Sequence, residues 1–304
     1  MNRQDVREHL TGPIDSVRVP FLRDGSVDYQ GLRNVIEFDI QAGSKTVLLT
    51  VGDSHYLCLS DQEIGEITRV AVEQTRGRAM LVAADRMHAT ARAVEFARFA
   101  KETGADVVMC LPPDWAESGT SQSIAEHYVT VSKVMPVMIV TGVFIPRGLR
   151  FALDTVSRAL AGSQSVVAVK DDMCGQFAVH LSLMAHPICA VFAGGLKVNH
   201  MTMHPYGCDG YMSSYITFRP EIAWRYWDAI TKNDLPAAAA IIRDYDIALF
   251  DLIASLPGGF DAGMHGIQEV FGIAERWRRP PYYSLNDAEM ERLKAFFEER
   301  GIAP

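Results

Sequence analysis

The sequence predicts a (β/α)8 barrel, or TIM barrel, with a C-terminal helical extension. Short apolar segments of strand length alternate with amphipathic, helix-like segments, and this unit occurs eight times before residue 232. Alternation at this period is typical of a parallel sheet, and eight units favour its closure into a barrel. From residue 233 onward the patterns are helical only. We therefore expect a barrel over residues 1–232 and, over residues 233–304, a helical extension packed on it.

An open, doubly wound sheet is the alternative architecture for the same alternation of segments. The 304 residues are enough for one large barrel or for two smaller domains. However, no Gly-x-Gly-x-x-Gly pattern follows the first expected strand, as a dinucleotide-binding sheet would require. No low-complexity linker divides the chain either, which favours the barrel with a packed extension.

Each expected strand is a short run of mostly apolar, often β-branched residues that is bounded by Gly, Pro or polar residues. Strands of a parallel barrel are covered on both faces, so they need continuous apolar runs rather than strict alternation. The eight expected strands span residues 14–19, 46–49, 79–83, 106–110, 136–140, 165–170, 189–192 and 210–212.

The helices between these strands carry start and stop signals. Ser26 precedes the first helix and Gly43 follows it, while Ser60 and Glu63 form a capping box for the second. In the tail, a Pro-Gly-Gly and a Pro-Pro sequence separate three further helices. The expected helices span residues 27–42, 61–75, 88–102, 121–134, 149–160, 177–185, 197–203, 220–230, 235–255, 263–274 and 286–300.

Composition and charge exclude several classes of function. The net charge is −8, hydrophobic residues make up 48% and charged residues 22% of the chain, and no basic stripe is present. These values indicate a globular protein and argue against a nucleic acid or an anionic membrane surface as partner. No apolar run is long enough for a membrane span, and the polar N-terminus does not resemble a signal peptide. Five scattered cysteines fit a reducing environment, so we expect a cytoplasmic protein.

The most informative segment is the sixth expected strand, in which four apolar residues lead directly into Lys170. The active site of such a barrel lies at the C-terminal ends of its strands, and Lys170 is the only ammonium at such an end. Burial of its stem would lower the pKa of Lys170, and a neutral amine is a nucleophile toward carbonyl groups. The alternative is a lysine that leaves the strand and pairs with Asp171 or Asp172 at the surface.

Several motifs, in order along the chain, resemble one family. Val19-Pro20-Phe21 and Asp24-Gly25-Ser26 match its opening, and Val166–Asp171 matches the strand that carries its imine-forming lysine. Further matches lie at residues 104–106, 112–113, 192–195, 208–213 and 279–285. Over nearly its whole length the chain thus resembles the dihydrodipicolinate synthase and N-acetylneuraminate lyase superfamily of class I Schiff-base aldolases.

The resemblance implies a lyase, aldolase or dehydratase in which Lys170 forms an imine with a small carbonyl substrate such as a 2-keto acid. It implies no cofactor and no metal ion, and a homo-dimer or homo-tetramer. Trp115 lies near the place of the family's inter-subunit tyrosine, so it would be an interface aromatic.

The chain departs from the family at two positions that matter for proton transfer. The family usually carries Gly-Thr-Thr-Gly-Glu after its second strand, where this chain has Val51–His55. The fifth strand of the family usually ends in a tyrosine that relays protons, where this chain has Val140-Thr141-Gly142. An altered relay is therefore expected, in which Asp53 and His55 are the candidate acid–base groups and Thr141 has a hydroxyl near the missing tyrosine's place.

The remaining candidates are expected to contact the substrate. Arg147 lies near the family's carboxylate-binding arginine, and Gly194 and Ser213 follow the last two strands. Gly52 and Ser54 lie in the loop after the second expected strand, and Trp115 follows the fourth. The candidate substrate-binding residues are therefore Gly52, Ser54, Trp115, Arg147, Gly194 and Ser213.

Asp53 and His55 also lead to a prediction about the substrate. A carboxylate raises the pKa of a neighbouring histidine, and such a pair passes a proton near neutral pH. Asp53 would repel the carboxylate of pyruvate. We therefore expect poor affinity for pyruvate and a preference for another carbonyl compound, such as a longer, sugar-derived keto acid anchored by Arg147.

Two other functions fit parts of the pattern. The missing threonines and tyrosine also fit a catalytically divergent barrel that acts as a small-molecule binding or regulatory protein. A metal-dependent aldolase would need several histidine and carboxylate ligands at the strand ends, where the sequence offers few. His200 and His204 stand at helical spacing without a third ligand and are expected on a polar helix face.

Overall fold

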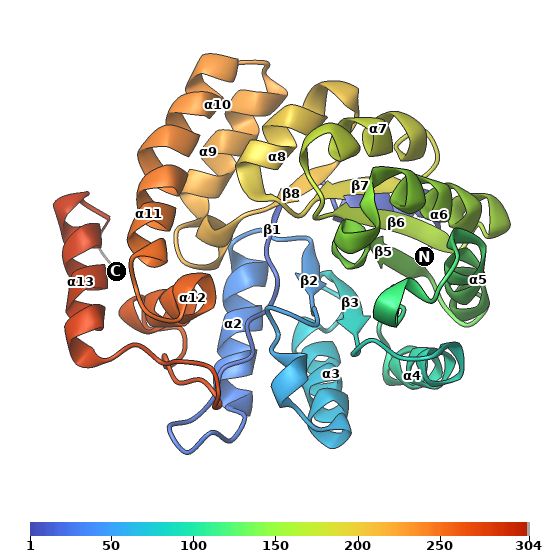
Figure 1. Ribbon diagram of the computed structural model, residues 1–304. Helices are drawn as coiled ribbons and strands as arrows, with labels where there is room; N and C mark the ends of the chain where they lie inside the picture. Colours follow the sequence, from blue (N-terminus) through green and yellow to red (C-terminus); the bar gives the residue numbers. More distant parts are fainter. Residues whose placement is uncertain (303–304) are drawn as a thin grey trace.

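The sheet is the barrel that the sequence predicts. The structure is a computed structural model that describes residues 1–302. All eight strands are parallel and follow the order β1-β8-β7-β6-β5-β4-β3-β2 (Figure 1). A bridge between Ser16 and Leu48 links the two ends of the sheet, so the barrel is nearly closed. The strands are β1 (Gly12–Ile14), β2 (Thr46–Leu48), β3 (Met80–Ala84), β4 (Val107–Cys110), β5 (Val137–Val140), β6 (Val166–Asp171), β7 (Ala190–Ala193) and β8 (Gly210–Met212).

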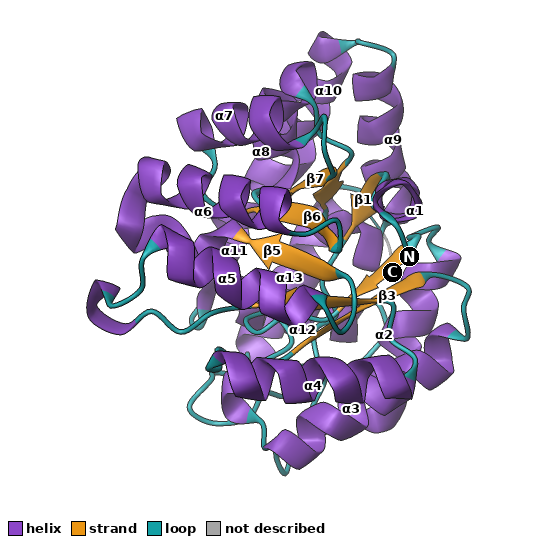
Figure 2. Cartoon of the chain, turned by 90° about the vertical axis from the view of Figure 1, so that its right-hand side faces the viewer, coloured by secondary structure: helices purple, strands orange, loops and turns teal. Residues whose placement is uncertain are grey.

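Helices cover the outside of the barrel, one after each strand (Figure 2). The predicted capping box forms: the Ser60 side chain accepts the backbone N–H of Glu63, and the Glu63 carboxylate accepts that of Ser60. The eight barrel helices are α2 (Tyr29–Gln41), α3 (Asp61–Thr75), α4 (Thr90–Thr103), α5 (Ser121–Ser132), α6 (Gly148–Gly162), α7 (Gly175–Ala185), α8 (Leu196–Met203) and α9 (Pro220–Thr231). Short helical turns lie in the connections: η1 (Tyr56–Cys58), η2 (Trp115–Glu117), η3 (Thr141–Arg147), η4 (His204–Tyr206) and η5 (Ser214–Thr217).

The strands are held by burial on both faces. Every residue of β3, β5 and β6 is buried, because inward side chains fill the barrel and outward ones pack under the helices. Full burial of a Val- or Leu-sized side chain contributes about 1.5–3 kcal/mol. The strand ends therefore stand on a rigid frame, and so do the polar residues that follow them.

The first strand differs from the prediction. We expected a strand over residues 14–19, but β1 ends at Ile14 after pairing with β8. The chain then changes partner: Ser16 bridges Leu48, and the N–H of Val17 donates to the Leu48 carbonyl at 2.9 Å. The apolar segment over residues 14–19 is therefore not one strand. It pairs first with β8 and then with β2, because it spans the point where the barrel closes.

An N-terminal helix, α1 (Arg3–His9), was not expected from the sequence. It lies against β6 and β7. Arg3 Nε donates to the carbonyl of Val166 at 3.0 Å, and Arg7 Nη2 donates to that of Cys189 at 2.7 Å. The helix thus covers the N-terminal ends of the strands, and the opposite end of the barrel holds the cavity described below.

The C-terminal extension packs on the barrel beside α9 and η5 (Figure 1). Phe218, which follows η5, meets Phe271 and Phe297 with ring centroids 5.1 and 5.7 Å away. The expected helix over residues 263–274 begins earlier, directly after Gly258, whose φ of 75° turns the chain. The extension comprises α10 (Leu235–Ile241), the π-helical turn η6 (Ile242–Ile247), α11 (Ala248–Ala254), α12 (Gly259–Val270) and α13 (Asp287–Glu299).

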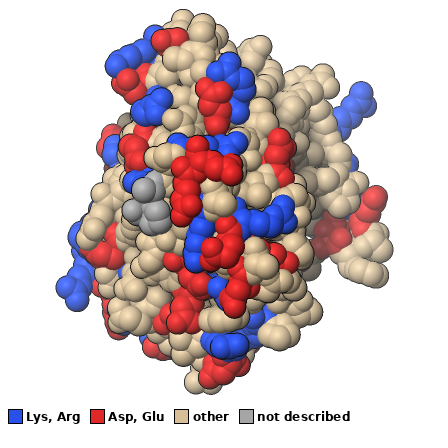
Figure 3. Space-filling model, turned by 90° about the vertical axis from the view of Figure 1, so that its left-hand side faces the viewer, with Lys and Arg blue, Asp and Glu red and all other residues tan. Residues whose placement is uncertain are grey.

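The surface on the side of the C-terminal helices is mixed in charge. Acidic and basic side chains alternate over this face without a large patch of one sign (Figure 3). Within residues 1–302, no helix combines the length and the apolar character needed to cross a membrane.

Candidate functional site

A cavity of about 710 Å³ opens at the C-terminal ends of the strands. Its position is the one at which (β/α)8 barrels carry their active sites. Four of the residues predicted to form the site line it, namely Gly52, Asp53, Lys170 and Gly194. The other lining residues are Asp15, Arg18, Thr50, Val51, Met87, Met109, Leu111, Val140, Gly142, Val143, Asp172, Gly195, Leu196, Met212 and Phe260.

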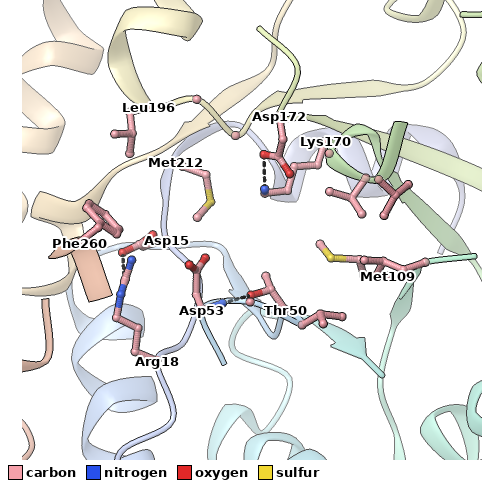
Figure 4. Close-up of a pocket in the computed structure, with 18 of the residues that line it drawn as sticks. Asp15, Arg18, Thr50, Asp53, Met109, Lys170, Asp172, Leu196, Met212 and Phe260 are labelled. Carbon is pink, nitrogen blue, oxygen red and sulfur yellow. Dashed lines mark hydrogen bonds and ion pairs between the residues drawn. The ribbon is translucent and has the colours of Figure 1, made fainter. Parts of the chain in front are cut away.

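Lys170 points into this cavity from the end of β6 and pairs with Asp172 (Figure 4). Its Nζ donates to Asp172 Oδ1 at 2.5 Å. The expectation that burial lowers the pKa of Lys170 is wrong. Burial acts in that direction, but Asp172 and the carboxylates of Asp53 and Asp171 outweigh it and raise the pKa above its ordinary value. Lys170 therefore rests as an ammonium, and the paired lysine lies in the cavity rather than on the outer surface.

Two glycines make room for the Lys170–Asp172 pair. A Cβ on Gly194 would overlap Asp172 Oδ1 and lie 2.8 Å from Lys170 Nζ. A Cβ on Gly142 would lie 3.3 Å from Asp172 Oδ2. The predicted site residue Gly194 thus has a steric role, since any side chain there would displace the pair.

Thr141 is buried behind the pair. Its hydroxyl donates to Asp171 Oδ1 at 3.0 Å and accepts the backbone N–H of Asp172 at 2.9 Å. Asp171 also accepts from Asn199 Nδ2 at 2.9 Å. Thr141 is not among the residues that line the cavity. Because its hydroxyl bonds the N–H of Asp172, it holds the backbone of Asp172 in place. Its role as a proton carrier stays a prediction.

The opposite end of the cavity carries a second ion pair, which the sequence patterns did not reveal. Arg18 Nη1 donates to Asp15 Oδ2 at 2.7 Å, and both side chains are 1% exposed. Asp53 lies between this pair and Lys170 (Figure 4). Its Oδ2 accepts a hydrogen bond from the Ser16 hydroxyl. Two ionisable residues inside the apolar run over residues 14–19 are the signal that would have revealed the pair.

The carboxyl groups of Asp15 and Asp53 differ in their proton affinity. Burial raises the pKa of Asp15 above its ordinary value despite the Arg18 guanidinium. Burial acts the same way on Asp53, but Arg18, the Ser16 hydroxyl and Lys170 hold the pKa of Asp53 below its ordinary value. Asp53 is therefore a carboxylate at neutral pH, and it faces the space between the two cations.

The predicted proton-passing pair of Asp53 and His55 does not form. His55 Nε2 lies 2.7 Å from His265 Nε2 of α12, and His55 is not among the cavity-lining residues. Asp53 acts to raise the pKa of His55, but burial and the positive charges of Arg278 and Arg18 outweigh it and lower the pKa to about 3. His55 is thus a neutral group that ties the loop after β2 to the extension, and it is not placed to exchange protons in the cavity.

The other predicted substrate contacts lie outside the cavity lining. Ser54 is fully buried, and its hydroxyl donates to the carbonyl of Val17 at 2.6 Å. Arg147 pairs with Asp114 and donates to the carbonyl of Gly119 at 3.0 Å. These contacts shape the loops, and substrate binding by these side chains stays a prediction.

Ser213 and Trp115 lie at opposite extremes of solvent exposure. Ser213 is buried just after β8, and its hydroxyl has no partner among the described residues. Trp115 is 89% exposed in η2, far more than any aromatic residue of the core. The roles of both residues in substrate binding stay predictions.

The wall between the two ion pairs is largely apolar. Met109 and Met212 lie toward the middle of the cavity, and Phe260 and Leu196 lie near the Asp15–Arg18 end (Figure 4). Phe260 comes from α12, so the extension supplies part of the cavity wall. Within residues 1–302, no group of three His, Cys, Asp or Glu side chains is arranged to hold a metal ion.

Comparisons with known proteins show the family and the fold of the chain. The model of the dihydrodipicolinate synthetase family matches residues 9–300. The 4-hydroxy-tetrahydrodipicolinate synthase of Chlorobaculum parvum is 26% identical over 96% of this chain and 98% of its own length. A protein described as a probable 5-dehydro-4-deoxyglucarate dehydratase from Methylobacterium radiotolerans is 28% identical over 82% of each chain.

Solved structures share the fold over nearly the whole chain. The N-acetylneuraminate lyase of Fusobacterium nucleatum superposes with a TM-score of 0.84 at 18% identity, covering 96% of this chain and 99% of that one. The dihydrodipicolinate synthase of Oceanobacillus iheyensis gives a TM-score of 0.83 at 18% identity, covering 99% of both chains. With a family match that spans nearly all of its length and a lysine in the cavity of its barrel, this chain is an enzyme of the dihydrodipicolinate synthetase family.

Proposed function

We propose that the protein is a Schiff-base lyase in which Lys170 forms an imine with a 2-keto acid or a related carbonyl substrate. The observation that carries the proposal is the position of the Lys170 amine, at the end of β6 and inside the cavity. Once protonated, an imine draws electrons from the neighbouring carbon, which permits cleavage, condensation or dehydration. Relatives named as synthases, lyases and dehydratases support this class of chemistry.

The cavity charges support a preference among carbonyl substrates. Asp53 is a carboxylate without a cationic partner in direct contact, so it would repel the carboxylate of pyruvate and accept a hydrogen bond from a hydroxyl group. The apolar wall around Met109 and Met212 would cover a carbon chain. We therefore propose a hydroxylated or longer keto compound as the substrate, with pyruvate as a poor ligand.

Borohydride trapping tests the imine. The protein is incubated with pyruvate, 2-oxobutanoate, 2-oxoglutarate or a 2-keto-3-deoxy sugar acid, and the reduced adduct is located by mass spectrometry. We expect an adduct on Lys170 and its loss in Lys170→Arg, whose guanidinium is too basic to attack a carbonyl. Lys101→Arg, on the exposed end of α4, is the matched control and should keep the adduct. No adduct in the wild type with any of these compounds contradicts the proposal.

A binding protein without turnover is the second candidate. It is favoured by the occupied hydroxyl of Thr141 and by His55, which faces His265 instead of the cavity. This candidate predicts that small keto acids raise the thermal unfolding midpoint while no adduct or product forms. Release of an aldehyde or of pyruvate from any compound of the panel would exclude it.

A further inference from the structure

We propose that Asp172 is the catalytic residue that transfers protons during imine formation and hydrolysis on Lys170. The inference rests on the imine function proposed above and assigns the acid–base group of that reaction.

Asp172 is the titratable side chain in contact with the reactive nitrogen. Its Oδ1 accepts from Lys170 Nζ at 2.5 Å, and its side chain is 28% exposed, toward the cavity. The glycines at positions 142 and 194 leave the carboxylate open on two sides, because a Cβ on either would meet it. A carbonyl group that approaches Nζ therefore also approaches the carboxylate, as general acid–base catalysis requires.

The other ionisable groups of the cavity lie at its far end or are already paired. Asp15 is held by Arg18. Asp53 accepts a hydrogen bond from the Ser16 hydroxyl and stands between that pair and Lys170, whose Nζ contacts Asp172 instead (Figure 4). No histidine, tyrosine or cysteine is among the described residues that line the cavity. Asp172 is thus the one cavity group of the described chain that both contacts Nζ and exchanges a proton.

The backbone keeps this carboxylate in position. The N–H of Asp172 donates to Thr141 Oγ1 at 2.9 Å, and Asp171 accepts the N–H groups of Met173 and Cys174 at 3.1 and 3.2 Å. These contacts fix the turn that follows β6. The carboxylate of Asp172 then points back over the end of its own strand toward Lys170.

The proton balance of imine formation closes on the pair. Asp172 first accepts a proton from the Lys170 ammonium, which leaves a neutral amine and a carboxylic acid. The amine nitrogen attacks the carbonyl carbon, the C=O π electrons move to oxygen, and the oxygen takes the proton from Asp172. Asp172 then accepts the second nitrogen proton and gives it to the hydroxyl group, which leaves as water while the C=N bond forms. The products are a protonated imine, water and the Asp172 carboxylate.

Asp172→Asn is the decisive variant, because the amide keeps the shape and loses the exchangeable proton. Imine formation is followed with cyanoborohydride between pH 6 and 9, using whichever compound of the panel labels the wild type fastest. We expect the plateau of the pH–rate profile to fall by about 10²–10⁴-fold, the range of general acid–base catalysis. Asp154→Asn, which removes an exposed carboxylate from α6, is the control and should leave the profile unchanged.

A purely electrostatic role gives a different profile. Loss of the Asp172 charge would lower the pKa of Lys170 and move the rise of the profile to lower pH, with an unchanged plateau. That outcome overturns the inference. A wild type that forms no adduct with any probe would overturn the imine function itself, and this inference with it, so the two failures are distinguishable.

A measurement on the wild type does not depend on how the variant folds. In a crystal structure of the reduced adduct, we expect the Asp172 carboxylate within about 3 Å of the secondary amine on Lys170. A carboxylate turned out of hydrogen-bond reach of both the amine and the substrate would overturn the inference.

Discussion

At the scale of single residues, the buried Asp15–Arg18 pair has the clearest consequence for stability. Arg18→Met would leave the Asp15 carboxylate buried without its partner, and breaking such a pair costs about 3–5 kcal/mol. The double variant Asp15→Asn/Arg18→Met removes both charges and should recover most of this loss. Urea unfolding measures both values. Arg158→Met, in an exposed pair, is the control and should change the free energy of unfolding by about 1 kcal/mol or less. A double variant as unstable as the single one would contradict this account of the pair.

The same residues show what sequence patterns reveal about a site and what they miss. Lys170 is predictable because an apolar run that leads directly into a lysine places its amine at the strand end, where barrels carry their active sites. The direction of its pKa shift is not predictable, since it depends on the side-chain rotamer that brings Asp172 against Nζ. Arg18 is missed because its segment has the pattern of one regular strand, whereas the strand in fact ends at Ile14.

At the scale of elements, the His55–His265 contact joins the loop after β2 to α12 and predicts a pH dependence. Burial lowers the pKa of His55 to about 3 and that of His265 well below its ordinary value, so both are neutral when folded. The unfolded chain takes up these protons below about pH 6.5, so stability is fullest above that pH and falls as the pH drops.

Unfolding free energies at pH 7.5 and pH 5 test this effect. For each of these two buried, neutral histidines, the free energy of unfolding should be about 2 kcal/mol lower at pH 5 than at pH 7.5. His55→Asn, which tolerates the local φ of 58°, should lose about that much less stability on acidification than the wild type does. His180→Asn, at an exposed position of α7, is the control. Equal losses in the wild type and His55→Asn would refute the assignment.

Elements whose signals are local were predicted, and those that depend on distant contacts were not. The capping box at Ser60 and Glu63 and the eight strand–helix units depend on neighbours in sequence. The partner of His55 lies 210 positions away. Helix α1 is held by arginine contacts to β6 and to the residue before β7, together with the burial of Val6 and Leu10. His200 was expected on a polar face, yet it is buried and lies 3.0 Å from the Tyr226 hydroxyl.

At the scale of the whole molecule, the exposed Trp115 predicts self-association. An aromatic side chain 89% exposed on a loop with positive φ at Ala116 and Glu117 is typical of a contact surface that lacks its partner. We expect a homo-dimer or homo-tetramer in sedimentation at micromolar concentration, and a shift toward smaller species in Trp115→Ser. Leu57→Ser, at another exposed apolar side chain, is the control. A wild-type monomer would remove this role.

Phe260 reaches the cavity from α12, whereas Lys170 and Asp172 stand at the end of a barrel strand and directly after it. The helix that carries Phe260 begins at two glycines with positive φ, and its first turn meets the far ion pair of the cavity, since the Arg18 guanidinium lies 5.3 Å from the Phe260 ring centroid. Mutations in this turn can therefore change which molecules enter while the reacting pair stays intact. Substitutions in the C-terminal extension can thus change the substrate without touching Lys170 or Asp172. We expect that a graft of residues 257–263 between relatives would transfer substrate selectivity while the reaction at Lys170 stays the same.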